Sequence, residues 1–306
     1  MQDTRRRILD SLADGPVSGP AIAEALGVSR AAVWKHVEAL RDSGFEIESR
    51  EEGYVLTGVP EFGGAAVEYG LDAPFDVEYH DAIGNTNDRA RELAGTGESE
   101  LAVLADEQTG ARGRLDRSWT SPSGGIWLSL VCRPDIPPSQ APIYTLAAAV
   151  ATTDALSEVG IDAGIKWPND VVVDGRKLVG ILTEMEGEAD RVSWIVVGIG
   201  INANVDSDAV PETATTIREL IGDVDRAVLT RALIERFEEL RNDPESVLPA
   251  WRTSAVTLGR RVRVTTPNDE IVGRAIDVEF PGALVVETET GIERVSAGDC
   301  EHLRPT

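Results

Sequence analysis

The sequence predicts an α+β protein of three domains, and three observations predict it. Apolar residues recur at helical spacing near the N-terminus, long apolar runs alternate with helical patterns in the middle, and short alternating strands follow Ala255. We therefore expect an N-terminal winged helix-turn-helix over residues 1–60, a central mixed-sheet domain over 61–254 and a small C-terminal β-barrel over 255–306. A chain of 306 residues is long enough for this division.

The first domain has the pattern of a helix-turn-helix. Three helices are expected, over residues 4–13, 20–26 and 30–43. In the third, Val33, Val37 and Leu40 form the inward face, and Ser29 can cap its N-terminus. Alternation after Gly44 predicts a hairpin or wing. The outward side of a recognition helix contacts the DNA major groove, and the candidate residues there are Ser29, Arg30, Ala31, Trp34, Lys35 and Arg41.

A winged helix can instead bind another protein, and its charge supports that alternative. Residues 1–60 hold 7 basic and 10 acidic side chains, which gives 7 − 10 = −3. Because phosphate neutralisation dominates affinity for DNA, an acidic domain binds DNA well only if its basic residues cluster. We expect DNA binding through the third helix, with a protein partner as the alternative.

Polar side chains gather where the central domain begins. Residues 58–74 are rich in Gly, Pro and Ala and are typical of a linker, with room for a short helix. A strand is expected at 77–79, and Asn85, Thr86 and Asn87 then precede a helix. Such side chains cap a helix, and they can also bind a polar ligand head, because unpaired N–H groups converge there.

The loop after the next strand carries most of the expected chemistry. An apolar run over residues 101–105 is followed by Gln108, Gly110, Arg112, Gly113, Arg114 and Arg117, with no apolar anchor before Trp119. Glycine lets backbone N–H groups approach a phosphate closely, and guanidinium groups suit phosphate and carboxylate oxygens. The loop therefore predicts an anion site, with a solvated charged loop as the alternative.

The remaining central stretches predict strands and helices around that loop. Lys166-Trp167-Pro168-Asn169-Asp170 interrupts a strand, and Asp174-Gly175 turns the chain into a further strand that begins with Arg176-Lys177. Residues 138–159 predict a helix buried against a sheet. The run over 192–202 ends in Gly198, Gly200 and Asn202, but it lacks the third glycine and the helix of a dinucleotide fold. Two cysteines and three histidines, widely spaced, disfavour disulfides and a histidine metal site.

The composition indicates the surroundings in which the chain works. Its net charge is −24, and only three of its 29 basic residues are lysines. Dispersed acid with scarce lysine is typical of halophilic proteins, whose charged surface stays hydrated in molar salt; a GC-biased composition is the alternative. The absence of a membrane-length apolar stretch and of a signal-peptide pattern predicts a cytoplasmic protein with no membrane partner.

Together these stretches resemble the family of bifunctional biotin-protein ligases that also act as biotin operon repressors. The loop from Gln108 to Trp119 is similar to that family's Gly-Arg-Gly-Arg-x-Gly-Arg sequence, and three further segments match in order: Lys166 to Asp170, Arg176 to Ile181, and Gly198 to Asn202. The sequence departs from the family pattern at three positions: Ala111 and Asp116 replace glycines, and Asn85 replaces a serine. These departures bear on loop flexibility and on contacts to the ureido ring.

The resemblance implies a class II synthetase-like central domain, an SH3-like C-terminal barrel, and two-step chemistry with ATP, biotin and Mg²⁺. Biotin is adenylated, and the biotinyl-5'-AMP then modifies a lysine of the biotin carboxyl carrier domain of a carboxylase. It implies biotin contacts from Asn85, Thr86, Asn87, Gln108, Arg112, Gly113, Arg114 and Lys177. It implies ATP or adenylate contacts from Arg112, Arg114, Arg117, Trp119, Asn169, Lys177 and Asn202. Catalytic roles are implied for Arg112, Arg114, Lys177 and Asp170, the last also as a metal ligand.

The resemblance also implies that the adenylate-bound chain forms a homodimer that binds operator DNA. Two alternatives remain: a lipoate-type protein ligase, which shares the reaction class, and a biotin sensor that regulates transcription without turnover. Plain core packing is the alternative for Trp119 and Trp167, and an ion pair is the alternative for Lys166.

Overall fold

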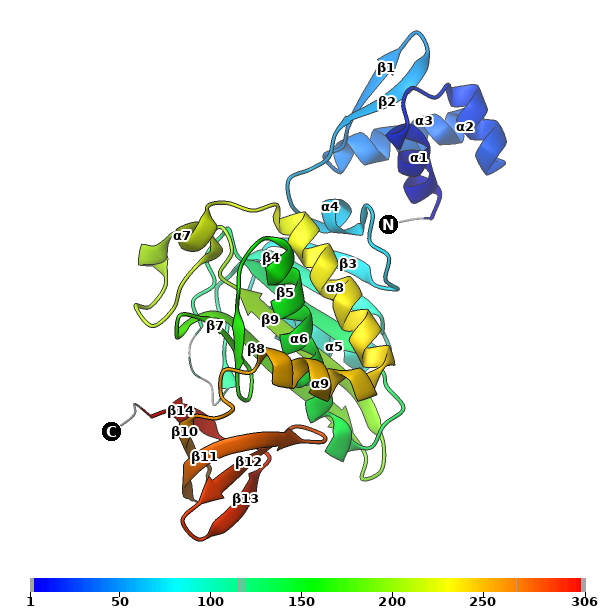
Figure 1. Cartoon of the computed structure of the whole chain (residues 1–306). Coiled ribbons are helices and arrows are strands. Elements are labelled where there is room, and N and C mark those ends of the chain that lie inside the picture. Colours follow the sequence, from blue (N-terminus) through cyan, green and yellow to red (C-terminus); the bar gives the residue numbers. More distant parts are fainter. Residues whose placement is uncertain (1–2, 115–116, 118, 268, 304–306) are drawn as a thin grey trace. The chain divides into compact units, whose positions relative to one another are not determined.

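The computed structural model describes residues 3–114, 117, 119–267 and 269–303 (Figure 1). The chain divides into two compact units, Met1–Asp72 and Ala73–Thr306, each with its own core. Across the described ranges, no helix is both long and apolar enough to cross a membrane.

The first unit is the expected helix-turn-helix. It comprises α1 (Asp3–Ala13), α2 (Gly19–Leu26), α3 (Arg30–Asp42), β1 (Glu46–Arg50), β2 (Gly53–Gly58) and α4 (Gly64–Glu68). Ser18 and Ser29 each accept a hydrogen bond from the backbone N–H three residues on, which begins α2 and α3. Gly27 ends α2 with a φ of 66°, a conformation that glycine adopts without a Cβ clash.

The inward face of α3 is the one that the periodicity predicts. Val33, Val37 and Leu40 are at most 1% exposed and pack with residues of α1 and of the hairpin. The predicted short helix after the hairpin is α4, and the adjoining Tyr69 meets Phe45 edge to face at 5.7 Å. The segment after the hairpin is therefore part of the first unit's core.

A seven-stranded mixed sheet organises the second unit. Its strands lie in the order β3 (Asp76–Ile83), β4 (Leu101–Gln108), β5 (Ile126–Cys132), β9 (Val192–Ile201), β8 (Arg176–Gly187), β7 (Asp170–Val173) and β6 (Gly164–Lys166). Among the described strands of this sheet, β3 and β4 pair in parallel and the other neighbours pair antiparallel. The strands at the centre are almost wholly buried because helices cover both faces.

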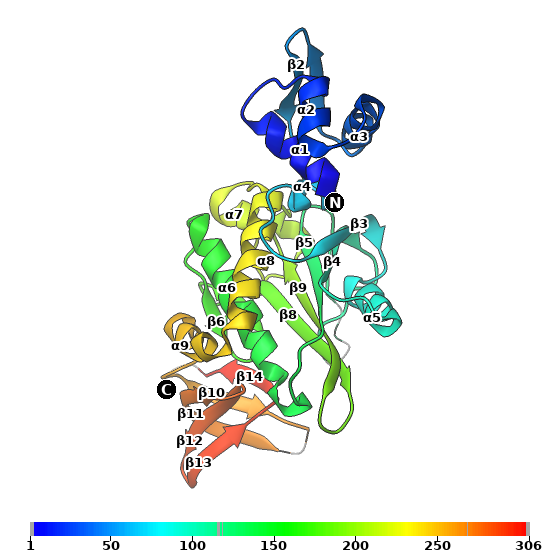
Figure 2. The same ribbon diagram turned by 90° about the vertical axis from the view of Figure 1, so that its right-hand side faces the viewer.

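Figure 2 shows α5 (Thr86–Thr96) on one face of the sheet and α6 (Pro142–Glu158) with α8 (Arg226–Asn242) on the other. Twelve residues of α6 are buried, since the helix lies between the sheet and the helices α8 and α9 (Pro244–Ser254). This confirms the prediction of a buried helix there. The second unit also contains the short α7 (Ile217–Ile221) and the 3₁₀ turns Pro138–Gln140 and Ser207–Ala209.

The C-terminal part is a small antiparallel sheet of five strands. Their order is β13 (Gly291–Val295), β12 (Ala283–Thr288), β11 (Glu270–Glu279), β10 (Arg261–Thr265) and β14 (Asp299–His302). The sequence predicted short strands after Ala255, and the structure has them there. Trp167, 1% exposed, fixes the small sheet to the large one, because its indole N–H donates to Gly282 O at 2.9 Å and its backbone N–H donates to Thr257 Oγ1. Core packing is thus the observed role of Trp167.

Candidate active site

The first candidate residues lie at the N-terminus of α5, where buried hydrogen bonds hold them. Asn85 Oδ1 accepts from the backbone N–H groups of Asn87 and Asp88 at 2.8 and 3.3 Å, so this side chain caps the helix. Thr86 donates its backbone N–H and its hydroxyl to Gln108 Oε1 at 2.8 and 3.1 Å. The end of β4 and the start of α5 are therefore tied together by polar side chains.

Asn87 is fixed from three sides. Its amide nitrogen donates to Glu184 Oε2 at 2.8 Å and to Leu182 O at 3.2 Å, and its carbonyl oxygen accepts from Ser129 Oγ at 2.6 Å. Gly198 faces this amide closely: a Cβ atom there would lie 2.2 Å from Asn87 Oδ1. We call Asn85, Thr86, Asn87 and Gln108 the amide pole of the site.

The loop from Gln108 to Trp119, which we call the arginine loop, begins and ends on backbone contacts to the sheet. Gly110 N donates to Gly84 O at 2.8 Å, and Gln108 pairs with Ser121 across the base of the loop. Within it, Trp119 N donates to Ala111 O at 3.1 Å. Residues 115, 116 and 118 lie outside the described residues, and with them the expectation about Asp116.

The segment that follows the arginine loop, residues 123–125, is held to β4 through Asp106 and Arg226. Burial would raise the pKa of Asp106, but hydrogen bonds from Ser123, Arg226 and the backbone of Gly124 keep it below its ordinary value. Arg226 also donates to Gly125 O at 2.9 Å. The loop therefore leaves and rejoins the sheet at fixed points.

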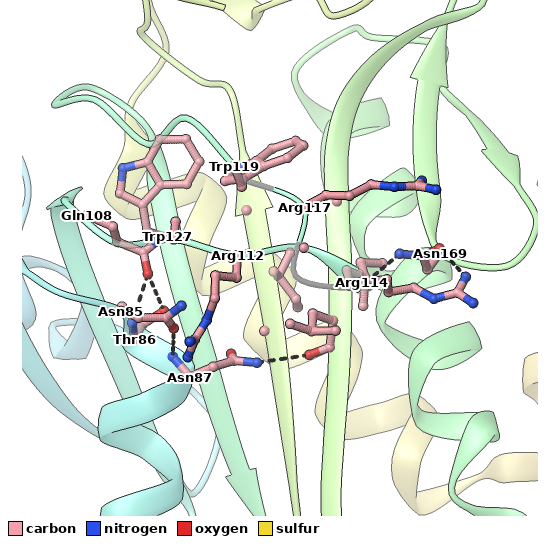
Figure 3. Close-up of a pocket in the computed structure, with 18 of the residues that line it drawn as sticks. Asn85, Thr86, Asn87, Gln108, Arg112, Arg114, Arg117, Trp119, Trp127 and Asn169 are labelled. Carbon is pink, nitrogen blue, oxygen red and sulfur yellow. Dashed lines mark hydrogen bonds between the residues drawn. The ribbon is translucent and has the colours of Figure 1, made fainter. Parts of the chain in front are cut away.

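Each of the three loop arginines has a protein partner. Arg112 contacts both oxygens of Asp88, at 2.8 and 2.9 Å, and Arg117 pairs with Asp299 of the C-terminal sheet. Arg114 donates to Asn169 Oδ1 at 3.1 Å (Figure 3). All three pairs are at least partly exposed, so a bound phosphate or carboxylate could replace these partners at low cost.

Lys177 and Asp170 form the opposite end of the site, which we call the cationic pole together with Arg114. Lys177 Nζ lies 2.6 Å from Asp170 Oδ1 and 4.7 Å from the centre of the Trp119 ring. The indole nitrogen of Trp119 is buried and has no hydrogen-bond partner within the described part of the chain. The Trp119 ring fits against the strands because Gly180 and Gly200 lie beneath it.

Amide pole and cationic pole line one cavity of about 290 Å³. The lining contains nearly all of the predicted ligand residues: Asn85, Thr86, Asn87, Gln108, Arg112, Gly113, Arg114, Arg117, Trp119, Asn169, Asp170 and Lys177. Figure 3 shows the amide pole and the pair Arg114–Asn169 on opposite sides of Trp119. The geometry suits an elongated ligand with a polar head at one end and an anion at the other.

Asn202 is the predicted ligand residue that the described lining does not include. It is 1% exposed, and its amide nitrogen donates to Thr215 O at 3.1 Å. The cavity includes residues that the sequence reasoning missed, among them Pro211, Trp127 and Asp299. Asp299 begins β14, which carries no motif, so only the tertiary fold brings it to Arg117.

The candidate DNA-contacting residues gather on one face of α3. Ser29, Arg30, Ala31, Trp34 and Lys35 are exposed, Trp34 to 55%. Arg41 is placed differently, because its guanidinium donates to Ile47 O, to Glu38 and to Ser49. Arg41 therefore ties α3 to β1 as well as lying on the outward side.

Comparison with known proteins agrees with this geometry. Residues 81–202 match the model of the biotin/lipoate A/B protein ligase family, residues 257–303 that of the biotin protein ligase C-terminal domain, and residues 4–55 a helix-turn-helix domain. The bifunctional ligase/repressor BirA of Bacillus spizizenii is 40% identical over 93% of both chains. The BirA of Escherichia coli is 31% identical and covers 96% of this chain and 95% of its own.

A solved structure of a biotin protein ligase is also similar to this chain. The biotin protein ligase of Aquifex aeolicus, in complex with biotin and ATP, superposes with a TM-score of 0.61 at 27% identity and covers 75% of this chain and 99% of that one. With relatives above 30% identity along nearly their whole length, the chain belongs to the biotin protein ligase family, and within it to the members that carry a helix-turn-helix domain.

Proposed function

We propose that this protein uses ATP to attach biotin to a lysine of a biotin carboxyl carrier domain through biotinyl-5'-AMP, and represses transcription in response to biotin. The observation that carries the enzymatic part is the single cavity with an amide pole at one end and a cationic pole at the other. Biotin has the matching form, because a polar ureido ring is joined by an apolar chain to a carboxylate.

The side chains of the site supply positioning and charge. The amide pole holds the ureido ring with preformed donors and acceptors, so little ordering is required when biotin binds. Lys177, Arg112 and Arg114 neutralise charge as the carboxylate oxygen attacks the α-phosphorus of ATP and pyrophosphate leaves. Trp119, Arg117 and Asn169 contact the adenylate in this proposal, and Gly113 lets the loop approach it closely. We assign Asn202 a supporting role beneath the nucleotide.

The donors at the cationic pole fit a magnesium ion. Mg²⁺ in nucleotide sites is bound by one or two carboxylates together with substrate phosphates, and Asp170 and Asp299 are the carboxylates among the described lining residues. We propose that Asp170 holds the ion, which would offset phosphate charge during adenylation. Asp170 also pairs with Lys177, so this carboxylate would exchange partners if it held the ion.

We propose that α3 binds operator DNA through Ser29, Arg30, Ala31, Trp34 and Lys35, while Arg41 holds the wing. The exposed Trp34 supports this role, since a large aromatic side chain at that position has no core to fill. We further propose that adenylate binding favours a homodimer, that the dimer occupies the operator, and that the protein acts in the cytoplasm of a halophile.

Two measurements test the proposal. With operator DNA from the protein's own promoter at its native salt, a gel shift that needs both biotin and ATP supports repression, and an unchanged mobility with both present contradicts it. Sedimentation with and without biotinyl-5'-AMP tests the dimer. Lipoate offered in place of biotin distinguishes a lipoate-type ligase, and biotin binding without pyrophosphate exchange would identify a sensor without ligase activity.

A further inference from the structure

A second cavity of about 290 Å³ lies beside the active-site cavity. It is lined by the N-terminal end of α6, by β8 and by two loops of the C-terminal sheet domain. The first loop contains Gly282, and the second contains Ser296 and Ala297. Among the described residues, four line both cavities: Arg114, Asn169, Ile181 and Leu182. The two cavities are therefore neighbours with a shared wall at the cationic pole.

The two polar residues of the shared wall are held differently: Asn169 is fixed to β8, and Arg114 extends from the arginine loop. Asn169 is held to β8, because its amide nitrogen donates to Ile181 O at 2.7 Å and Ile181 N donates back to Asn169 O at 2.9 Å. Arg114 reaches Asn169 by a single hydrogen bond of 3.1 Å from the arginine loop (Figure 3). The side chain of Arg114 can therefore leave the wall at a cost of about one hydrogen bond.

The lining of the second cavity is mainly apolar. Its floor is formed by Trp167, Pro168 and Leu146, and Thr145 and Thr183 satisfy each other through a 2.8 Å hydrogen bond. Among the described residues that line it, Arg114 is the charged one and no carboxylate occurs. Such a lining accepts methylene groups, and it disfavours an ammonium ion relative to the neutral amine.

We propose that this cavity, the acceptor channel, admits the lysyl side chain of the carrier protein, and that Arg114 and Asn169 form the gate between the acceptor channel and the adenylate. Two features of the acceptor channel favour a lysyl side chain as its ligand. The channel shares a wall with the reaction site, and its mainly apolar lining suits a side chain that has an apolar stem and must lose a proton to react. This inference rests on the proposed function, because it assigns the entry route of the second substrate.

The step that the acceptor channel serves is an aminolysis. The neutral amine nitrogen attacks the carbonyl carbon of the mixed anhydride, the new C–N bond forms, and the C–O bond to phosphate breaks. AMP leaves with the electron pair of that bond, and the proton of the amine passes to water. Excluding carboxylates from the acceptor channel avoids an ion pair that would hold the lysine in its unreactive charged form.

Narrowing the mouth of the acceptor channel tests the proposal. Ala297 is exposed on the loop between β13 and β14 and lies outside the described active-site lining. We expect Ala297→Trp to reduce kcat/KM for an apo biotin carrier domain by roughly tenfold or more. Biotin-dependent pyrophosphate exchange, and trapping of the adenylate by hydroxylamine, should remain within about twofold of the parent, because neither requires a long side chain to enter.

Two further variants make the test decisive. Ala189→Trp places the same ring on the exposed turn between β8 and β9 and should transfer biotin to the carrier at the parental rate. Met185→Trp narrows the acceptor channel from the β8 side and should repeat the Ala297→Trp result. Parental transfer in both channel variants would overturn the inference, as would equal losses of exchange, hydroxylamine trapping and carrier transfer. Absence of exchange in the parent would instead refute the proposed function.

Discussion

Two glycines on β9 allow the two ends of the active site to be perturbed separately, beginning with Gly198. A Cβ atom at Gly198 would lie 2.2 Å from Asn87 Oδ1 and 2.9 Å from Asn87 Cγ and Nδ2. Gly198→Ala must therefore displace Asn87 from Ser129 and Glu184. Losing one neutral and one charged hydrogen bond in a buried place costs about 3 kcal/mol of unfolding free energy. We also expect the KM for biotin to rise at least about tenfold.

Gly200 provides the matched substitution on the same strand. Its added Cβ atom would lie 3.1 Å from Trp119 Nε1 and 3.4 Å from two ring atoms of Trp127. Because Trp119 lies on a loop and is only partly buried, it can move, and the unfolding free energy of Gly200→Ala should change by no more than about 1 kcal/mol. The displaced ring should raise the KM for ATP by roughly tenfold and leave the KM for biotin within about twofold.

Urea unfolding and biotin-dependent pyrophosphate exchange, both in molar KCl, measure these quantities. Gly95→Ala in α5 is the control, since a Cβ atom there meets nothing within 4 Å, and it should stabilise the protein by about 0.5–1 kcal/mol without changing either KM. If Gly198→Ala raised the KM for ATP and Gly200→Ala that for biotin, the assignment of the two poles would be wrong.

Three further predictions concern pH, DNA and salt. Burial, Lys166 and Arg260 lower the pKa of His302 from 6.5 to about 4, so the unfolded chain takes up a proton at this residue first as the pH falls. The unfolding free energy should therefore fall by on the order of 2 kcal/mol between pH 6.5 and 4. His302→Gln should remove this pH dependence in urea titrations made at each pH. Glu51 and Glu52 place two exposed carboxylates at the turn of the wing. The double variant Glu51→Lys/Glu52→Lys should therefore bind operator DNA more tightly and with a steeper salt dependence, measured by fluorescence anisotropy. Unchanged binding would place the wing away from DNA. If the net charge of −24 reflects adaptation to salt, the unfolding free energy should rise between 0.2 and 2 M KCl by roughly 1 kcal/mol or more, and a flat response would favour compositional bias.

The elements set by local patterns were predictable from the sequence. Gly27 ends α2 and Ser29 begins α3. The spacing of Val33, Val37 and Leu40 identifies the buried face of α3. The polar residues at the start of α5 likewise predicted a contact to a polar ligand head. The arginine loop predicted an anion site. Their meeting in one cavity follows from the parallel pairing of β3 and β4, which brings the ends of both strands together.

The contributions that depend on distant chain segments were not predictable. Asp299 reaches Arg117 only because β14 pairs with β10, and the short β14 has no distinctive pattern. The family resemblance implied a nucleotide contact from Asn202, yet its amide is directed to the backbone of Thr215. In both cases hydrogen bonding across the fold decides the position of the side chain, and residue type alone does not.

The central claim is that the cavity between the amide pole and the cationic pole adenylates biotin, and isotope exchange between pyrophosphate and ATP in molar KCl tests it most directly. We predict exchange that depends on biotin, is not supported by lipoate, and falls by at least about a hundredfold in Lys177→Ala, because that change removes the cation beside Asp170 and Trp119. Exchange that lipoate supports as well as biotin, or that survives in Lys177→Ala, would contradict the account. Biotin binding with no exchange in the parent would show that the cavity is a sensor.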